Sequence, residues 1–558
     1  MYLNKFLILL LGLIVLPLNG FCQSLDSEAI SAKRPNILLF LADDLGYSDL
    51  GSFGGEINTP NLDQLANSGA KLTNFVAAPT CSPTRSMIMS GTYNHRAGLG
   101  AMAEWTAENQ KDKPGYEGYL NDSVVSLPML LRDSGYSTFI AGKWHLGMKP
   151  DQGPDKRGFD KSFVMLPGAG NHFSDRGFNP RLPKVPYREN GKQVSLPDSF
   201  YSTEFYTDKA IEYIDSAVEN DSPFFGYVAY TAPHWPLQVP KKYSDKYIGK
   251  YDAGYESIRS QRLKNLVKQG ILSPDVVPHS GSVCFDEWSE LPEEKQKYQA
   301  RLMEIYAGMV DALDDNIGRI IQHLENTGEL DNTLIVFISD NGADARPSLG
   351  LGFENGYMAK EFDNTLNNIG KENSFVSYAG AWALVGSTPF RSHKGQPSEG
   401  GIRVPAILRF PSLIKGNTIS REFMSVMDLM PTFLDVAGTT HPGAEYKGHK
   451  IWPVEGRSLL PHLSGEEPVV HSQPRYGFSI FKNQGLRVGD WKIIQLSEFT
   501  KPSWELYNLA SDPGETSDLA DKLPEKLQEM ISEWETFTDT GIVVAEPNAR
   551  APNECQKI

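Results

Sequence analysis

The feature that most limits the fold is a set of short apolar runs, each long enough for one buried strand. Residues 36–41 are apolar after Asn36, and Asp43 and Asp44 follow the run almost at once. Similar runs occupy residues 137–141, 224–230 and 333–339. An apolar run without polar alternation is typical of a strand that is covered on both faces of a parallel sheet. The sequence therefore predicts a central, mostly parallel sheet.

Helical patterns lie between these runs. The strongest covers residues 298–324, where apolar side chains recur every three or four positions, at Leu302, Ile305, Met309, Leu313, Ile317, Ile320 and Leu324. This spacing is typical of one long amphipathic helix. Shorter helices are expected at residues 61–68, 127–133 and 427–436. Strands that alternate with helices predict an α/β fold, in which a large mixed sheet is sandwiched by helices.

The pattern changes after about residue 438. Residues 485–494 indicate a hairpin around Gly489 and Asp490, and a helix is expected near residues 524–534. We therefore expect a main domain at residues 34–438. A smaller C-terminal α+β subdomain with a short antiparallel sheet should occupy residues 439–558 and end in an extended tail.

The first 22 residues are typical of a secretory signal peptide. Lys5 precedes an apolar run at residues 6–18, and Gly20 lies near a cleavage position before Gln23. The run is shorter than the about 20 residues that cross a bilayer, and no later segment replaces it. We therefore expect an exported protein, periplasmic or extracellular, without a membrane span.

Charge and cysteine content exclude two classes of protein. The chain has 53 Lys and Arg against 69 Asp and Glu, a net charge of −16, which argues against a nucleic-acid-binding protein with a basic face. Removal of Cys22 with the signal peptide leaves Cys81, Cys284 and Cys555, too few for a disulfide framework. Cys284 and Cys555 can form a pair or remain single buried thiols.

The segment Cys81-Ser82-Pro83-Thr84-Arg85 has the pattern of a helix start, because proline is well tolerated in a first turn. The free N–H groups and the dipole at such a position favour an anion. They would also lower the pKa of a thiol at residue 81. A small buried cysteine beside a surface arginine is the simpler alternative.

Oxygen-bearing side chains follow two of the predicted strands. Asp43 and Asp44 follow the first strand, and Asp340 and Asn341 follow the strand at residues 333–339. Since the carboxyl ends of parallel strands carry the sites of such sheets, these side chains are expected to meet there. Oxygen donors without His or Cys suit Ca²⁺ or Mg²⁺ better than Zn²⁺. Each pair alone also fits a turn or a helix cap.

Candidate cationic residues follow other strands. Lys143 and His145 come after the strand near residues 138–141, on one side of it if alternation continues. His234 lies between two prolines after the strand at residues 224–230, and Lys394 follows His393. With a divalent cation, Arg85, Lys143 and Lys394 would outweigh the three aspartates by about two charges. An acidic protein can therefore hold an anion in one pocket.

The Cys-x-Pro-x-Arg segment at residues 81–85 resembles the sulfatase family of the alkaline-phosphatase superfamily. Within that family the chain looks closest to bacterial calcium-dependent arylsulfatases, through residues 98–104 and 113–122. The resemblance extends through residues 392–395, 399–405 and 504–509, and it runs from Arg34 to about Leu519.

The resemblance implies an exported sulfuric ester hydrolase, arylsulfatase-like, whose catalytic domain is the main domain at residues 34–438. In the family the cysteine is oxidised to formylglycine by a maturation enzyme, and this form of residue 81 binds calcium, in preference to Mg²⁺, with Asp43, Asp44, Asp340 and Asn341. The resemblance also implies that Lys143, His234 and Lys394 contact the sulfate or the leaving oxygen. Arg85 would hold the aldehyde hydrate and His145 would act on it, while His393 has no implied role.

Two other functions stay open for the same residues. One is a phosphate or phosphonate ester hydrolase on the same scaffold, and the other is a non-catalytic binder of sulfated glycans. The substrate of the sulfatase would be an aryl sulfate or a sulfated carbohydrate. The long segments 167–200, 240–292 and 343–390 are expected to be loops that frame the mouth of the pocket.

Overall fold

The computed structural model describes residues 33–280, 285–346, 357–378, 380–497 and 503–549. The predicted signal peptide at residues 1–22 lies outside the described residues, as do Cys284 and Cys555. From Arg34 onward the chain clusters as one unit, which contains both the large sheet and the C-terminal sheet.

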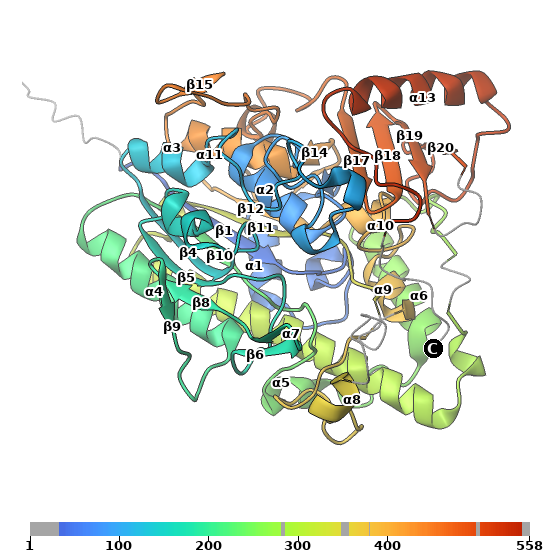
Figure 1. Ribbon diagram of the computed structural model, residues 1–558. Helices are drawn as coiled ribbons and strands as arrows, with labels where there is room; N and C mark the ends of the chain where they lie inside the picture. The colour runs from blue at the N-terminus through green and yellow to red at the C-terminus, as the bar shows by residue number, and fades with distance from the viewer. Residues whose placement is uncertain (1–32, 281–284, 347–356, 379, 498–502, 550–558) are drawn as a thin grey trace, which may run out of the picture. The chain divides into compact units, whose positions relative to one another are not determined.

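The centre of this unit is one mixed sheet of ten strands (Figure 1). Their order is β13 (Thr418–Ser420), β2 (Ala70–Leu72), β12 (Ala406–Arg409), β11 (Thr333–Ser339), β1 (Asn36–Ala42), β10 (Phe224–Ala229), β4 (Ser137–Lys143), β5 (Lys161–Met165), β8 (Tyr187–Glu189) and β9 (Lys192–Val194). The strands β11, β1, β10, β4 and β5 run parallel, and β12 and β8 flank them in the antiparallel direction. The four predicted strands are confirmed, and they are neighbours in the sheet.

Helices cover both faces of the sheet, as Figure 1 shows. One face carries α1 (Pro60–Ser68), α4 (Ser202–Glu219) and α7 (Glu293–Asn326), and the other carries α2 (Cys81–Ser90), α3 (Leu127–Asp133) and α11 (Leu429–Val436). Strand β1 shows why both faces are apolar. Its Leu38 and Phe40 join the first core and its Leu39 and Leu41 the second, because successive side chains of a strand alternate between faces. The predicted α/β sandwich is confirmed.

The helix predictions differ from the structure mainly at their starts. Helix α7 begins at Glu293, after Pro292, and Glu293 and Glu294 in its first turn complement the positive end of the helix dipole. That turn is polar, so apolar periodicity placed the start at residue 298. The helix predicted at residues 427–436 is α11, preceded by a 3₁₀ turn at Val426–Asp428.

A second, antiparallel sheet forms the C-terminal part. It consists of β17 (Arg475–Ile480), β18 (Asn483–Val488), β19 (Trp491–Gln495) and β20 (Glu505–Asn508), and α13 (Pro524–Thr538) packs against it (Figure 1). The predicted hairpin is confirmed, with Gly489 at a φ of 61° in its turn. From Thr540 to residue 549, where the described part ends, the chain forms no helix or strand, and the backbone N–H of Val543 donates to the hydroxyl of Tyr116 over 2.9 Å.

The three long segments that the sequence predicted as loops contain short ordered elements. Residues 167–200 contain the hairpin of β6 (Arg176–Asn179) and β7 (Leu182–Lys184) as well as β8 and β9. Residues 240–292 contain α5 (Lys241–Ser244) and α6 (Gly254–Lys268), and residues 343–390 contain α8 (Tyr357–Glu361) and α9 (Gly380–Gly386). Outside these segments the remaining elements are β3 (Phe75–Val76) with β14 (Met424–Ser425), β15 (Glu445–Tyr446) with β16 (His449–Lys450), α10 (Glu399–Ile402) and α12 (Leu460–Leu463).

No helix in the described ranges is both long and apolar enough to cross a membrane.

A buried ion network holds the turn that follows β1. Arg262 of α6 donates to Asp49 over 2.5 Å and to Glu56 over 2.7 Å, and all three side chains are nearly inaccessible to solvent. Asp49 also accepts hydrogen bonds from the hydroxyl of Tyr306 in α7 and from the backbone N–H of Gly46. The network therefore ties the chain just after Asp43 and Asp44 to two helices.

Arg262→Met would leave two buried carboxylates without a cation, so we expect the free energy of unfolding to fall by about 3–5 kcal/mol. Urea denaturation followed by tryptophan fluorescence measures this change. Lys297→Met removes the cation of an exposed pair with Glu293 and should leave the denaturation midpoint unchanged. An unchanged midpoint for Arg262→Met would show that the network does not stabilise the fold.

Candidate active site

The carboxyl ends of four neighbouring parallel strands bring the predicted site residues to one place. Asp43 and Asp44 follow β1, Asp340 and Asn341 follow β11, Lys143 ends β4 and His234 follows β10. The turns are joined through backbone hydrogen bonds, in which Asp340 donates to Ala42 and Asp43 donates to Ala232, each over 3.1 Å. Helix α2 adds Cys81 and Arg85, and the segment before α10 adds Lys394. All of these side chains are buried.

Each of the three aspartates of the site has a cationic partner. The ammonium of Lys143 lies 2.6 Å from Asp43, and the ammonium of Lys394 lies 2.7 Å from Asp44. Arg85 donates to one oxygen of Asp340 through Nε over 3.1 Å and through Nη2 over 2.8 Å. Its Nη1 donates to the backbone carbonyl of Lys143 over 3.0 Å. Arg85 thus fixes both Asp340 and the end of β4.

The carboxylates still carry more negative charge than this environment favours. Burial and the nearby Asp340 raise the pKa of Asp43 to about 7. Burial also raises the pKa of Asp44, against the attraction of Lys394. For Asp340 burial acts in the same direction, but Arg85, Lys143 and Lys394 together outweigh it and the pKa is lowered. A further positive charge at Asp43 and Asp44 would stabilise their ionised forms.

The carboxylate and amide oxygens of the site fit a hard divalent cation, and the thiol of Cys81 and the imidazole of His234 lie beside them. Ligand atoms of Asp43, Asp44, Cys81 and His234 lie within 4.8 Å of one another. Two further oxygens, Oδ1 of Asp43 and Oδ1 of Asn341, are buried and accept no hydrogen bond from the described residues. The amide of Asn341 donates to Asp44 over 2.6 Å, which fixes its orientation beside the carboxylate. Orphaned buried oxygens of this kind are typical of a cation site.

The prediction of an acidified thiol at Cys81 is wrong. Cys81 begins α2 as expected, with its Sγ 3.8 Å from Oδ1 of Asp44. Burial, followed by the charge of Asp340, raises the pKa of this thiol well above its ordinary value, although Lys143 and Lys394 oppose the shift. A helix dipole is a weak effect beside full burial among carboxylates. The thiol itself is therefore a poor nucleophile here.

His145 does not continue the alternation of β4. The strand ends at Lys143, and His145 has a φ of 56°, so the predicted shared side with Lys143 has no basis in strand geometry. Its Nε2 lies 3.3 Å from Oε1 of Glu104, and its Nδ1 is buried and bonded to none of the described residues. Burial lowers the pKa of His145. At the half-exposed Glu104, desolvation raises the pKa, but the attraction and the hydrogen bond of His145 with a backbone hydrogen bond together lower it to about 2.

His234 lies between the other site residues and the aromatic wall of the pocket. Its Nδ1 donates to the carbonyl of Trp235 over 2.6 Å, and its Nε2 lies 3.3 Å from Asp44. Burial and then Lys394 lower the pKa of His234 well below its ordinary value. His393 is also buried, but its ring contacts the carbonyl of Lys394 and takes no place among the carboxylates.

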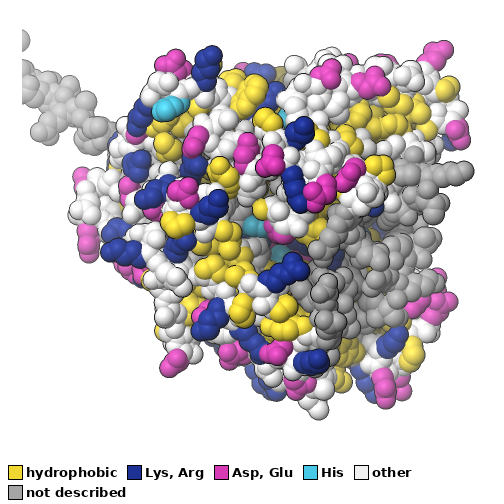
Figure 2. Space-filling view, viewed as in Figure 1, with side chains coloured by type: hydrophobic (Ala, Val, Ile, Leu, Met, Phe, Trp, Pro, Cys, Tyr) yellow, Lys and Arg dark blue, Asp and Glu magenta, His cyan; other side chains and the backbone are white. Residues whose placement is uncertain are grey.

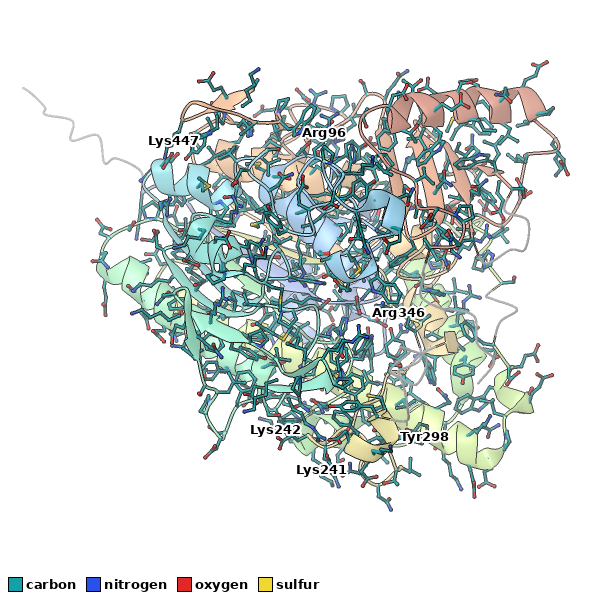
Figure 3. The ribbon with its side chains drawn as sticks, in the orientation of Figure 1. Arg96, Lys241, Lys242, Tyr298, Arg346 and Lys447 are labelled. Carbon is teal, nitrogen blue, oxygen red and sulfur yellow. The ribbon has the colours of Figure 1, made fainter. Side chains whose placement is uncertain are left out.

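The site also contains an ion pair that the sequence patterns did not predict. Arg346, labelled near the centre of Figure 3, donates to Asp344 over 2.7 Å. Asp344 lies 3.4 Å from the ammonium of Lys394 and accepts the indole N–H of Trp235 over 2.9 Å. Asp344 follows the Asp340-Asn341 turn by a few residues, yet no short spacing pattern distinguishes it from a loop aspartate.

A cavity of about 600 Å³ opens over the site, with Cys81, His145, His234 and Lys394 in its wall. Histidine atoms are visible near the middle of the face in Figure 2, with hydrophobic side chains beside them. Segment 167–200 contributes much of the wall, as predicted, and segment 343–390 contributes Arg346. Segment 240–292 contributes none of the described wall residues, because its helix α6 packs against α9 instead.

Comparison with known proteins agrees with this geometry. The family model named Sulfatase matches residues 35–439, and the model of the N-sulphoglucosamine sulphohydrolase C-terminal region matches residues 396–536. The chain belongs to the sulfatase family. An uncharacterised sulfatase of Schizosaccharomyces pombe is 44% identical to this sulfatase over 545 residues, which cover 94% of this chain and 98% of that protein.

Two further relatives support the same assignment. An arylsulfatase of Klebsiella aerogenes is 37% identical over 443 residues, which cover 78% of this sulfatase and 93% of that protein. The crystal structure of Ps i-CgsB in complex with k-i-k-neocarrahexaose superimposes with a TM-score of 0.65 at 25% identity, over 92% of this chain and 95% of that one. The resemblance to the sulfatase family that residues 81–85 indicated is confirmed, and the enzyme class is sulfatase.

The raised pKa of Cys81 predicts slow alkylation in folded sulfatase that still carries the thiol. At pH 8 the thiol remains protonated, since its pKa lies well above the ordinary value, and the neutral form reacts slowly. We expect iodoacetamide to label the peptide that contains Cys81 at least about tenfold faster in urea than in the folded protein. Peptide mass spectrometry measures the rates, and fast labelling of the folded protein would contradict the stated electrostatics.

Proposed function

We propose that the chain is an exported arylsulfatase-type enzyme that cleaves sulfate monoesters with a formylglycine made from Cys81 and a bound Ca²⁺. The observation that carries the proposal is the position of Cys81, buried at the start of α2 and 3.8 Å from Asp44, among carboxylates and cations. A neutral thiol at this position is a poor nucleophile and a poor ligand for a hard cation. An oxidised residue 81 would be held by the same surroundings.

The modification requires a formylglycine-generating maturation enzyme as a partner. The hydrated aldehyde supplies two hydroxyl groups, one to attack sulfur and one whose deprotonation later expels sulfate by C–O cleavage. The signal peptide at residues 1–22 would direct the enzyme to the periplasm or the exterior. Residues 34–438 would form its catalytic domain, with residues 439–558 as the C-terminal subdomain.

Asp43, Asp44, Asp340 and Asn341 are the residues that would hold the cation, together with residue 81. Four protein oxygen donors with flexible coordination suit Ca²⁺, and Mg²⁺ suits them less. The cation supplies Lewis-acid stabilisation of negative charge and favours the ionised form of a hydroxyl at residue 81. The orphaned oxygens of Asp43 and Asn341 support this assignment.

Lys143 and Lys394 would bind the sulfate. Both ammonium groups are buried at the carboxylates that flank Cys81, and a cation on those carboxylates leaves the lysines a net attraction for an anion. The burial of Lys143 and Lys394 excludes water, which strengthens their interaction with charge that develops on the sulfuryl oxygens. Arg85 would orient Asp340, and through it the hydrate at residue 81.

The two histidines have opposite proton roles in this proposal. His145 is neutral because burial lowers its pKa, and with Nε2–H facing Glu104 its free Nδ1 can accept the proton of the remaining hydroxyl. His234 would protonate the leaving oxygen. Burial and then Lys394 lower the pKa of His234, and an anionic substrate beside the ring opposes them and favours the protonated imidazole.

Substrate turnover tests the proposal against the phosphatase and the glycan-binder alternatives. Matured protein should release sulfate from 4-nitrophenyl sulfate with a higher kcat/KM than it releases phosphate from 4-nitrophenyl phosphate. Cys81→Ala should lower kcat by about a thousandfold or more, since it removes the nucleophile. Lys149→Met, at an exposed lysine near Lys143, should leave kcat unchanged. A preference for phosphate, or full activity of Cys81→Ala, would contradict the proposal.

Removal of the metal should lower both activity and thermal stability. After dialysis against a chelator we expect the melting temperature to fall by a few degrees and to recover with excess Ca²⁺, because a ligand that binds only the folded state stabilises it. Asp43→Asn should abolish the calcium-dependent shift, while Asp175→Asn on the surface keeps it. Differential scanning calorimetry measures the shift, and a shift that persists in Asp43→Asn would refute the assigned ligands.

A further inference from the structure

The wall of the pocket beyond the sulfate-binding groups is mostly apolar. Its side chains include Met102, Trp105, Met148, Phe178, Leu182 and Trp235. Phe178 packs edge-on against Trp235, with ring centroids 5.3 Å apart, and Trp235 in turn contacts the ring of His234. A leaving group whose oxygen lies at His234 would therefore meet an aromatic surface.

Few polar groups in this wall are available to a substrate. The carboxylate of Glu104 faces His145, and Arg346 is held by Asp344. The side-chain oxygen of Asn179 accepts the backbone N–H of Arg181 over 2.9 Å, which leaves its amide N–H2 group as a donor for a substrate. A sugar ring needs several hydrogen-bond partners to replace its hydration, whereas a flat apolar body does not. The wall therefore favours an aromatic leaving group over a carbohydrate.

Arg181 differs from the other cations at this pocket. It lies between β6 and β7 at the tip of the hairpin, it is exposed, and it lines the cavity. Its neighbours on the hairpin have acidic partners, Arg176 at Glu361 and Lys184 at Asp175. In the described part of the chain no carboxylate lies within ion-pair distance of the guanidinium of Arg181. A cation at the pocket that has no acidic partner among the described residues, in a protein of net charge −16, suits an anionic ligand.

We infer that the pocket selects aryl sulfates that carry a second anionic group, a carboxylate on the ring, and that Arg181 is the specificity residue that binds this group. The inference rests on the proposed sulfatase function and adds the substrate class to it. The sulfate end binds at Lys143 and Lys394, and the ring lies along Phe178 and Trp235. The guanidinium of Arg181 matches a planar carboxylate through two parallel hydrogen bonds.

The test compares 4-carboxyphenyl sulfate with its methyl ester, which has the same ring and no second charge. The quantity compared is kcat/KM for the acid divided by kcat/KM for the methyl ester. We expect this ratio to be about fivefold higher in the unaltered enzyme than in Arg181→Met, mainly because the KM for the acid is lower. Arg181→Lys should keep part of the ratio, because it keeps the charge and loses the planar fork. Lys184→Met is the matched control on the same hairpin and should keep the ratio unchanged. Added salt should reduce the ratio, since the contact is exposed.

The outcomes separate this inference from the proposed function. Equal ratios in the unaltered enzyme and Arg181→Met, with the methyl ester still cleaved, would overturn the role of Arg181 and leave the sulfatase function intact. A monosulfated sugar cleaved with a higher kcat/KM than both aryl esters would overturn the aromatic substrate class. Absence of sulfate release from every ester by matured protein would refute the proposed function itself.

Discussion

Three buried carboxylates face three buried cations at the carboxyl edge of the central sheet, and the site depends on this balance. A buried charge without a partner costs several kcal/mol, so Asp43, Asp44 and Asp340 require Lys143, Lys394 and Arg85 beside them. The balance needs four adjacent strands that end at the same level and a helix that begins at residue 81. Much of the surrounding fold, including the buried network at Arg262, keeps those strand ends and turns in place.

The same balance explains how an acidic protein can bind an anionic substrate. The pKa of Asp43, raised to about 7, and the raised pKa of Asp44 show that the cluster favours one more positive charge. A divalent cation provides it and frees the two lysines to attract the sulfate. The additional pair of Asp344 and Arg346 has no net charge and leaves this sum unchanged, but it links Lys394 to the aromatic wall at Trp235. Surface charge and pocket charge are thus separate properties of this chain.

Sequence patterns predicted those parts of the structure that neighbouring residues determine by themselves. The apolar run before Asp43 allows little except a buried strand, whereas no local pattern predicts the order of the strands in the sheet. The contact of Arg85 with Asp340 joins residues 255 positions apart, and Glu104 reaches His145 from a 3₁₀ turn, so neither contact has a spacing signal. The pKa of Cys81 was mispredicted because the helix start is visible in the sequence, whereas the carboxylates around it are visible only in three dimensions. Segment 167–200 lines the pocket as predicted, whereas the separate position of segment 240–292 depends on tertiary packing.

The central claim is that residue 81 is an aldehyde hydrate beside a hard dication, held by the buried carboxylates. A high-resolution crystal structure of active protein, purified from a host that matures it, tests this claim most directly. The account predicts two oxygen atoms and no sulfur on the side chain of residue 81, with a calcium ion in contact with Asp43, Asp44, Asp340 and Asn341. An intact cysteine sulfur with no ion among those carboxylates, in protein that hydrolyses sulfate esters, would contradict it.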